Sequence, residues 1–307
     1  MASAAQQLDF DGLRPPCAGL SDAHIAWRDR LRGFVDEHIA PHIDDWNEAA
    51  TFPDTLYTEA AAAGLMGFGF PAEYGGWDFE PDLYHRVIFA EEFHRLGSGV
   101  VFADLATPWI ALPPVVASGS DELQDEVTRP VLAGEKRIAF AITEPGGGSD
   151  VSGMSTTAER DRDGFRVNGA KTLISGALRA DYLLTVVRTG GEGMQGLSLM
   201  LIDAASEGVS MEAVPGLQWY SAANGTIMFE NCRVPAARLL GTEGGAFRSL
   251  ASQFNIERFS GVGATLAMAR VATADAIDWA QQRKTFGKRL IDHQRIRHTL
   301  VDMIRSI

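Results

Sequence analysis

A glycine-rich run in the middle of the chain is the first feature that suggests chemistry. Thr143–Asp150 reads TEPGGGSD and directly follows the apolar segment Ile138–Ile142, which is predicted to be a strand. Three adjacent glycines allow a backbone to approach a ligand closely, and their N–H groups can point at anionic oxygens. The same composition suits a flexible hairpin loop equally well. No helix is predicted to follow the run, so it is not a Rossmann dinucleotide fingerprint.

A basic segment with one aromatic residue is the second feature. Arg283–Lys288 reads RKTFGK and separates two long predicted helices. Its four polar side chains could clamp a phosphate while the phenyl ring stacks on a planar group. A solvated helix end, where basic side chains interact favourably with the helix dipole, explains the same pattern. The pattern by itself leaves both interpretations open.

A glutamate with apolar neighbours is the third feature. Glu257 lies in the segment FNIERF, Phe254–Phe259. A carboxylate in apolar surroundings tends to have a raised pKa, which a general base working near neutral pH requires. The alternative is a surface glutamate paired with Arg258, although adjacent residues of a helix do not face each other.

Other catalytic and metal-binding patterns are not found in the sequence. The seven histidines form no H-x-x-x-H or His/Cys cluster, so we expect no metal site. There is no G-x-S-x-G segment, which would mark a serine nucleophile. Cys17 and Cys232 are too few for a disulfide framework and favour a reducing environment.

The composition excludes several classes of protein. The chain has 307 residues, of which 46% are hydrophobic and 22% charged, as is ordinary for a globular protein with more than one domain. The net charge of -13 argues against wrapping of nucleic acid, because phosphate neutralisation needs an excess of Lys and Arg. No apolar stretch reaches the length of a membrane span, and the N-terminus lacks the patterns of signal and transit peptides. We therefore expect a cytoplasmic protein.

The first zone that must position these residues, 21–136, is predicted to be helical. Ser21 is a plausible N-cap for a helix that Pro41 ends, and further helices are expected after Pro53, after Pro81, over about 104–118 and after Ser120. Gly67–Gly76 is predicted to be a turn segment.

The second zone, 137–240, changes to short β-rich runs separated by turn residues. Since no helices lie between these runs, they favour an antiparallel sandwich or barrel. The runs are Ile138–Thr143, Gly164–Val167, Tyr182–Val187, Leu197–Ile202 and Thr226–Phe229.

The third zone, 241–307, is helical again. One helix of about 35 residues is predicted after Gly244–Gly245, and a second one from about Asp292, beyond a break at Gly287. Two helices cannot close a core alone, so we expect an incomplete bundle that another surface completes. The predicted fold class is thus α+β, with an N-terminal helical domain, a central antiparallel β-barrel or sandwich, and a C-terminal helical bundle.

Several short motifs follow one another from about Ser21 to Ile307. They are Phe70–Gly76 (FPAEYGG), Ala141–Asp150 (AITEPGGGSD), Asn168–Lys171 (NGAK), Glu230–Pro235 (ENCRVP), Arg283–Lys288, and finally His293 and Gln294. In this order and within an α–β–α frame, they resemble the acyl-CoA dehydrogenase family. The resemblance favours the ligand-binding interpretation of all three features described above.

The resemblance implies FAD as cofactor and an acyl-CoA thioester as substrate. It also implies an electron acceptor such as electron-transfer flavoprotein, a place in fatty acid or lipid metabolism, and a homo-oligomer, dimer or tetramer, unless a related chain completes a hetero-oligomer. Thr143 would face the flavin ring and Ser149 the pyrophosphate. The residues implied to contact FAD are Phe140, Ile142, Thr143, Gly148, Ser149, Leu173, Ile174 and Ser175, with Arg283, Thr285, Phe286, His293 and Gln294 reaching the FAD of a neighbouring subunit.

The family places its catalytic base in one of two positions. Some members have a glutamate in a loop near the C-terminus, and others have a Glu-Arg pair on the long helix. Glu257-Arg258 matches the second arrangement, which implies Glu257 as the base that removes the α-proton. Ser149, Asn255 and Arg258 would contact the substrate.

The chain departs from the family pattern at two of these places. Leu173-Ile174-Ser175 stands where the family usually has Trp-Ile-Thr, and Asn255 stands where some members have an Asp that contacts CoA. Two alternatives therefore stay open beside the dehydrogenase. One is a flavin monooxygenase or oxidase on the same scaffold, and the other is a catalytically silent partner subunit.

Overall fold

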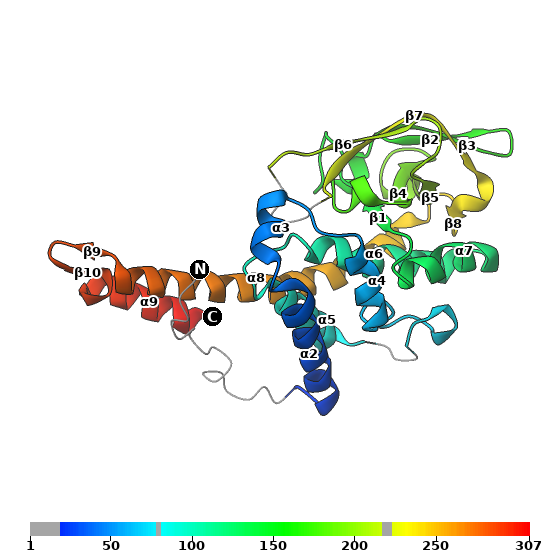
Figure 1. The fold of residues 1–307 in the computed structure, drawn as a ribbon. Helices are drawn as coiled ribbons and strands as arrows, with labels where there is room; N and C mark the ends of the chain where they lie inside the picture. The colour runs from blue at the N-terminus through cyan, green and yellow to red at the C-terminus, as the bar shows by residue number, and fades with distance from the viewer. Residues whose placement is uncertain (1–18, 78–80, 217–222) are drawn as a thin grey trace. The chain divides into compact units, whose positions relative to one another are not determined.

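The computed structural model describes residues 19–77, 81–216 and 223–307, so Cys17 lies outside the described residues (Figure 1). The chain divides into two compact units. The first contains residues up to Ala40, Leu83–Ser98 and Phe259–Ile307, and the second contains Pro41–Asp82 and Gly99–Arg258. The three-domain division at 21–136, 137–240 and 241–307 stays a prediction.

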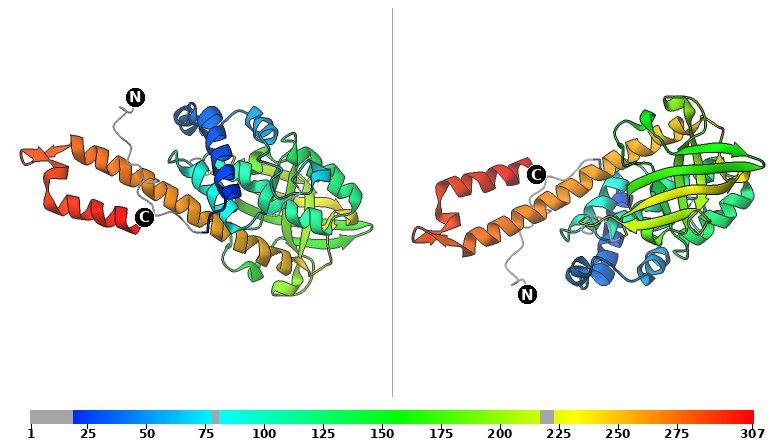
Figure 2. Two further views of the ribbon diagram at one scale, coloured as in Figure 1. Left: turned by 90° about the horizontal axis from the view of Figure 1, so that it is seen from below. Right: turned by 90° about the horizontal axis from the view of Figure 1, so that it is seen from above.

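Helices make up most of the first unit. Its elements are α2 (Asp22–Phe34), the π-helix Val35–Ile39, α5 (Leu83–His94), the part of α8 (Ala246–Gln282) beyond Arg258, the hairpin β9 (Lys284–Thr285) and β10 (Lys288–Arg289), and α9 (Gln294–Ser306). After the hairpin, α9 runs back alongside the end of α8 (Figure 2). The predicted long helix and the second helix are confirmed, but the long helix ends at Gln282, and Gly287 lies in the turn of the hairpin that follows it.

Aromatic side chains pack α2 against α5 in this unit. The rings of Phe34 and Phe93 are 6.4 Å apart, and Phe93 stacks on Phe89 at 4.5 Å. The indole N–H of Trp27 donates to the His85 carbonyl oxygen at 3.1 Å. Because the apolar residues of α2 recur at helical spacing, they reach a single face and bury it here.

The second unit contains four further α-helices among its described residues, α3 (Ile43–Ala49), α4 (Thr55–Ala62), α6 (Phe102–Ser118) and α7 (Asp121–Leu132). Ser120 caps α7 as predicted, since its hydroxyl accepts from the Leu123 N–H at 3.3 Å. The sequence did not predict α3, which buries none of its residues and so shows no apolar periodicity.

The sheet of the second unit has eight strands. They are β1 (Ile138–Ala141), β2 (Thr157–Asp161), β3 (Gly164–Ile174), β4 (Tyr182–Arg188), β5 (Leu197–Asp203), β6 (Val209–Ala213), β7 (Gly225–Pro235) and β8 (Leu239–Leu240). The order is β6-β7-β3-β2-β4-β5-β8, with β1 beside β4. Phe165, Val167, Leu183, Met200 and Phe229 belong to its buried core.

The α+β fold class is confirmed, with one difference in the sheet. The sequence predicts antiparallel pairing, but β1 pairs with β4 in parallel, from Ile138 opposite Tyr182 to Ala141 opposite Thr185. One further parallel pair joins Thr157 to Arg188, so the sheet is mixed. The strands β2 and β6 were not predicted, because each is largely solvent-facing and carries little apolar alternation.

No helix in the described ranges is long and apolar enough to cross a membrane.

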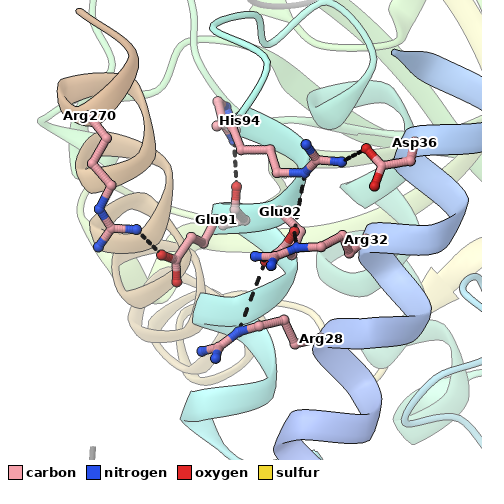
Figure 3. A network of polar contacts seen from close by, with 9 residues as sticks. Arg28, Arg32, Asp36, Glu91, Glu92, His94 and Arg270 are labelled. Carbon is pink, nitrogen blue, oxygen red and sulfur yellow. Dashed lines mark hydrogen bonds and ion pairs between the residues drawn. The ribbon is translucent and has the colours of Figure 1, made fainter. Parts of the chain in front are cut away.

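A buried carboxylate ties α5 to α2 in the first unit (Figure 3). The side chain of Glu92 is 2% exposed and lies 2.7 Å from Arg32, 3.3 Å from Arg95 and 4.0 Å from Arg28. Arg95 also pairs with Asp36. Such a group is strongly stabilised only while its cations are present, because its desolvation is otherwise uncompensated.

We expect Glu92→Ala to lower the free energy of unfolding by about 3–5 kcal/mol, because three guanidinium groups lose their shared anion. Urea unfolding followed by circular dichroism measures the change. Glu37→Ala is the control, since the Glu37 side chain is 79% exposed and should cost less than about 0.5 kcal/mol. Equal effects of the two substitutions would contradict this account.

Candidate functional site

The glycine-rich run forms a closed turn at the end of β1. The Glu144 N–H donates to the Gly147 carbonyl at 3.1 Å, and the Gly147 N–H donates back to the Glu144 carbonyl at 3.0 Å. Pro145 and Gly146 form the exposed tip. Within the described ranges, the N–H groups of Gly146, Gly148 and Ser149 donate to no other group. The turn is therefore held by its own backbone and leaves three donors available.

A buried ion pair anchors this turn to β3. The Lys171 side chain is 0% exposed, and its Nζ donates to Glu144 Oε1 at 2.8 Å and to the Ile142 carbonyl at 3.0 Å. Glu144 also accepts from the Ser155 N–H and hydroxyl, both at 2.7 Å, and from the Thr156 N–H at 2.9 Å. Both oxygen acceptors of the ammonium thus come from the residues on either side of Thr143.

The protonation states of the pair follow from opposing effects. Burial acts to raise the pKa of the Glu144 carboxyl, but hydrogen bonds from Lys171, Ser155 and Thr156 outweigh it and lower this pKa to about 2. Burial lowers the pKa of Lys171 to about 8, against the raising effect of Glu144. Both groups are charged at neutral pH.

A bulge in β3 presents an apolar side chain next to the turn. Lys171 lies opposite Ile227 and Ile174 opposite Gly225, so Thr172 and Leu173 share one partner position on β7. Leu173 has a φ of 58° and is 49% exposed. The Thr172 N–H donates to the Thr143 carbonyl at 2.8 Å. The structure therefore brings together two segments that the sequence analysis connected only through the resemblance.

The remaining residues predicted around this site differ in burial. Phe140, Ile142, Thr143 and Ser175 are half-buried, Ile174 is buried, and Gly148 and Ser149 are exposed. Among the residues that the structure describes, none forms a hydrogen bond with the hydroxyl of Thr143, Ser149 or Ser175. Three hydroxyls and three amides are thus free for a polar ligand, beside an apolar surface at Leu173.

The turn after β3 requires a glycine. Gly176 has a φ of 73°, and a Cβ at this position would lie 3.2 Å from Asp104 Oδ1. A side chain would therefore be strained in its backbone and crowded by α6. This turn ends the segment 173–175 and fixes where Ser175 lies.

The proposed base lies on the first part of α8, in the same unit as the glycine-rich turn. Glu257, Asn255 and Arg258 are all exposed. Desolvation by the surrounding protein raises the pKa of the Glu257 carboxyl, although the nearby charge of Arg258 lowers it. The guanidinium of Arg258 lies 6.0 Å from the centre of the Phe254 ring. Among the residues described, none is paired with Glu257 in a salt bridge, so the simple surface-pair interpretation is not supported.

The basic segment forms a hairpin in the first unit. Phe286 lies at its turn with a φ of 51° and is 97% exposed. The Thr285 hydroxyl is 3.3 Å from His293 Nε2, and the rings of Phe286 and His293 are 6.5 Å apart. Gln294 is the first residue of α9, and Arg283 is exposed just before β9. The structure thus gathers these five predicted residues around one turn of the first unit.

Known protein families match nearly the whole length from residue 21 to residue 307. Family models for the N-terminal, middle and C-terminal domains of acyl-CoA dehydrogenases match residues 21–135, 139–232 and 244–307. The chain belongs to the acyl-CoA dehydrogenase family. It is therefore related to FAD-dependent flavoproteins, oxidoreductases that act on CH–CH groups.

Individual relatives agree with this assignment. The acyl-CoA dehydrogenase apdG of Emericella nidulans is 32% identical over 93% of this chain and 69% of its own length. The caffeyl-CoA reductase–Etf complex subunit CarC of Acetobacterium woodii is 34% identical over 91% of this chain and 74% of its own. The crystal structure of a probable acyl-CoA dehydrogenase from Mycobacterium abscessus has a TM-score of 0.85 at 38% identity, covering 93% and 76% of the two chains.

The donor set at the turn fits FAD. An acyl-CoA dehydrogenase needs donors for the polar edge and pyrophosphate of the cofactor and an apolar surface for the ring. The free hydroxyls of Thr143, Ser149 and Ser175, the free glycine amides and the exposed Leu173 supply both. Leu173 offers a smaller flat surface than the tryptophan that the family usually has at this position, but its side chain is exposed.

Sequence reasoning missed the two charged residues that hold this site. Glu144 and Lys171 both stand in motifs that carry the resemblance, but neither was assigned a role. Their signal is an anionic residue shortly after the apolar strand Ile138–Ala141 and a cationic residue inside the strand Gly164–Ile174. Such residues are almost never fully buried unless they are paired.

We expect Glu144 to contribute stability that is lost in acid. Its pKa is about 2 in the folded protein against 4.5 ordinarily, so the unfolded chain binds the proton first as the pH falls. The contribution, up to roughly 3 kcal/mol, is complete above pH 4.5 and disappears toward pH 2.

Urea unfolding of the wild type and of Glu144→Gln, measured at intervals from pH 5 to pH 2, checks this expectation. The variant should be less stable at pH 5 and should lose less stability with acid than the wild type. Parallel pH curves for the two proteins would show that the carboxyl has an ordinary pKa in the folded state.

Proposed function

We propose that this chain dehydrogenates an acyl-CoA thioester to the 2,3-enoyl-CoA, with Glu257 as the base that removes the α-proton. The observation that carries the proposal is a carboxylate at the Glu-Arg position of α8 that forms no salt bridge with any described residue, in a chain that belongs to the acyl-CoA dehydrogenase family.

The raised pKa suits this task. A base whose pKa lies nearer the working pH takes a proton more readily than an ordinary carboxylate does. Desolvation raises the pKa of Glu257 more than the charge of Arg258 lowers it, so these two effects together set the basicity of the carboxylate. When bound, FAD supplies the two-electron oxidant for the β-carbon–hydrogen bond. Glu257 holds the α-proton on its carboxylate after transfer.

The proposed cofactor contacts divide between the two units. Phe140, Ile142, Thr143, Gly148 and Ser149, together with Leu173, Ile174 and Ser175, would contact the FAD held by the same chain. Arg283, Thr285, Phe286, His293 and Gln294 would reach the FAD of a neighbouring subunit. The exposure of Phe286 at the turn of a hairpin is compatible with this second group, because its ring is accessible to a molecule outside the chain. A homo-oligomer, dimer or tetramer, is therefore part of the proposal.

The proposed partners follow the chemistry of the reaction. Ser149, Asn255 and Arg258 would contact the acyl-CoA, with Arg258 as a cation for its phosphates. The electrons must leave the enzyme after each turnover, and an electron-transfer flavoprotein is the proposed acceptor. The name of the relative CarC, a subunit of a reductase–Etf complex, supports this class of acceptor.

Glu257→Gln should still bind FAD and acyl-CoA. Its rate of flavin reduction should fall by roughly 10²–10⁴-fold, because the amide cannot accept the α-proton. Anaerobic stopped-flow spectra with a panel of acyl-CoA thioesters measure the rate at which the flavin absorbance bleaches. Asp275→Asn, an exposed acidic position on the same helix, should reduce at the wild-type rate. Unchanged bleaching in Glu257→Gln would eliminate Glu257 as the base. Oxygen consumption by the wild type without another acceptor would instead favour an oxidase.

The same reaction should depend on pH in one direction. Since the base must be ionised, the reduction rate falls as the pH drops through the pKa of Glu257, which lies above the ordinary value of 4.5. Arg258→Gln removes the cation that lowers this pKa, so the fall should move to higher pH. A fall that moves to lower pH, or does not move, would contradict the opposing role of Arg258.

A further inference from the structure

We infer that Lys171 is a positioning residue for the flavin, because it joins the two segments that the proposed function assigns to the FAD held by the same chain. On one side it holds residues 142–144 through the Ile142 carbonyl and the Glu144 carboxylate. On the other it begins the bulge that presents Leu173. This inference rests on the proposed function for the identity of the ligand.

The first contact set restrains Thr143 from both neighbours. One Nζ donates to the residue before Thr143 and to the residue after it. A third contact, to Met154 Sδ at 3.6 Å, occupies the remaining direction of the ammonium. Since Lys171 is completely buried, no water competes for these donors. Thr143 can therefore change position only if the pair is broken.

The second contact set restrains Leu173. Lys171 is the last β3 residue in regular register with β7 before the bulge, and Thr172 then binds the Thr143 carbonyl. The Thr172 hydroxyl is also 2.8 Å from the Thr226 hydroxyl across the bulge. A left-handed φ at a leucine is unfavourable by itself, so the surrounding bonds must impose it.

Stability alone does not require a charged pair at this place. Buried ion pairs can often be replaced by apolar side chains without loss of stability, because desolvation cancels most of the attraction. An ammonium differs from a methyl group in that it sets directions and distances to its acceptors. We therefore expect the loss of the pair to alter flavin binding even where the fold remains as stable as before.

The test compares Lys171→Met, the double variant Glu144→Gln with Lys171→Met, and the control Lys136→Met, all in the full chain. Lys136 makes a pair of the same type, 2.8 Å from Asp181, but its side chain is 48% exposed. Three quantities are measured for each protein: the Tm without FAD, the Kd for FAD by fluorescence titration, and the visible circular dichroism of the bound flavin.

Lys171→Met should lower the Tm, and the double variant should recover most of it because no buried charge is left unpaired. Both should bind FAD at least about tenfold more weakly, with a changed visible circular dichroism spectrum, while Lys136→Met stays within about twofold of the wild type. A double variant with recovered Tm and with the Kd and spectrum of the wild type would overturn the inference.

A milder variant decides the question if the others do not fold. Ser155→Ala removes one hydrogen bond from Glu144 and leaves both charges in place. It should fold and change the flavin spectrum, whereas an unchanged spectrum and Kd would overturn the inference.

The two proposals fail separately in these measurements. A wild-type flavin that no acyl-CoA thioester reduces would contradict the proposed function and leave the positioning result standing. A wild type that takes up no FAD would overturn both.

Discussion

A single ammonium group without access to water constrains the central part of this protein. Lys171 is buried inside the second unit, where an unpaired charge would be prohibitively costly. Its charge therefore obliges a carboxylate and a backbone carbonyl to lie within hydrogen-bond distance. Glu144 and Ile142 meet this requirement, and in doing so they fix the start of the glycine-rich turn. The position of the first turn residue thus depends on where the ammonium finds its acceptors, and the backbone bonds between Glu144 and Gly147 close the turn.

Because bonds from Glu144 hold the turn in place, the amides and hydroxyls that could bind a ligand form no bonds of their own with the described residues. Glu144 uses its carboxylate for Lys171, Ser155 and Thr156, and its backbone for Gly147. The amides of Gly148 and Ser149 and the nearby hydroxyls are not needed to hold the turn. The bulge beyond Lys171 similarly turns Leu173 outward instead of into the core. A rigid frame with unused donors can bind a cofactor without first paying to order a loop.

The first unit also contains a buried charge that needs partners of opposite charge, but there the buried group is an anion. There a buried carboxylate, Glu92, gathers guanidinium groups from α2 and from Arg95, which directly follows its own helix α5. Arg270 on α8 pairs with the neighbouring Glu91. Each unit thus joins segments distant in the sequence through a buried charge whose partners come from another element. Replacement of a whole buried pair by apolar side chains often costs little stability, whereas removal of one partner is strongly destabilising.

Local patterns in the sequence determined most of the secondary structure and the family. Apolar residues at helical spacing, proline and serine at helix starts, and Gly244–Gly245 before the long helix are short-range signals, and α2, α7 and α8 follow them. The motifs from Phe70 to Gln294 carried the resemblance that the comparisons confirm. Elements with little buried surface, such as α3 and β6, left no such signal.

Only the tertiary structure decided which residues meet. The parallel pairing of β1 with β4 depends on long-range packing, and so does the contact of Lys171 with Glu144, which lies 27 positions away. Burial converts these two ordinary charged residues into a pair, and no residue pattern reports burial directly. The bulge at Leu173 likewise depends on its register with β7. Sequence periodicity shows which face of an element is apolar, whereas the partner of a buried charge is set by the folding of the whole unit.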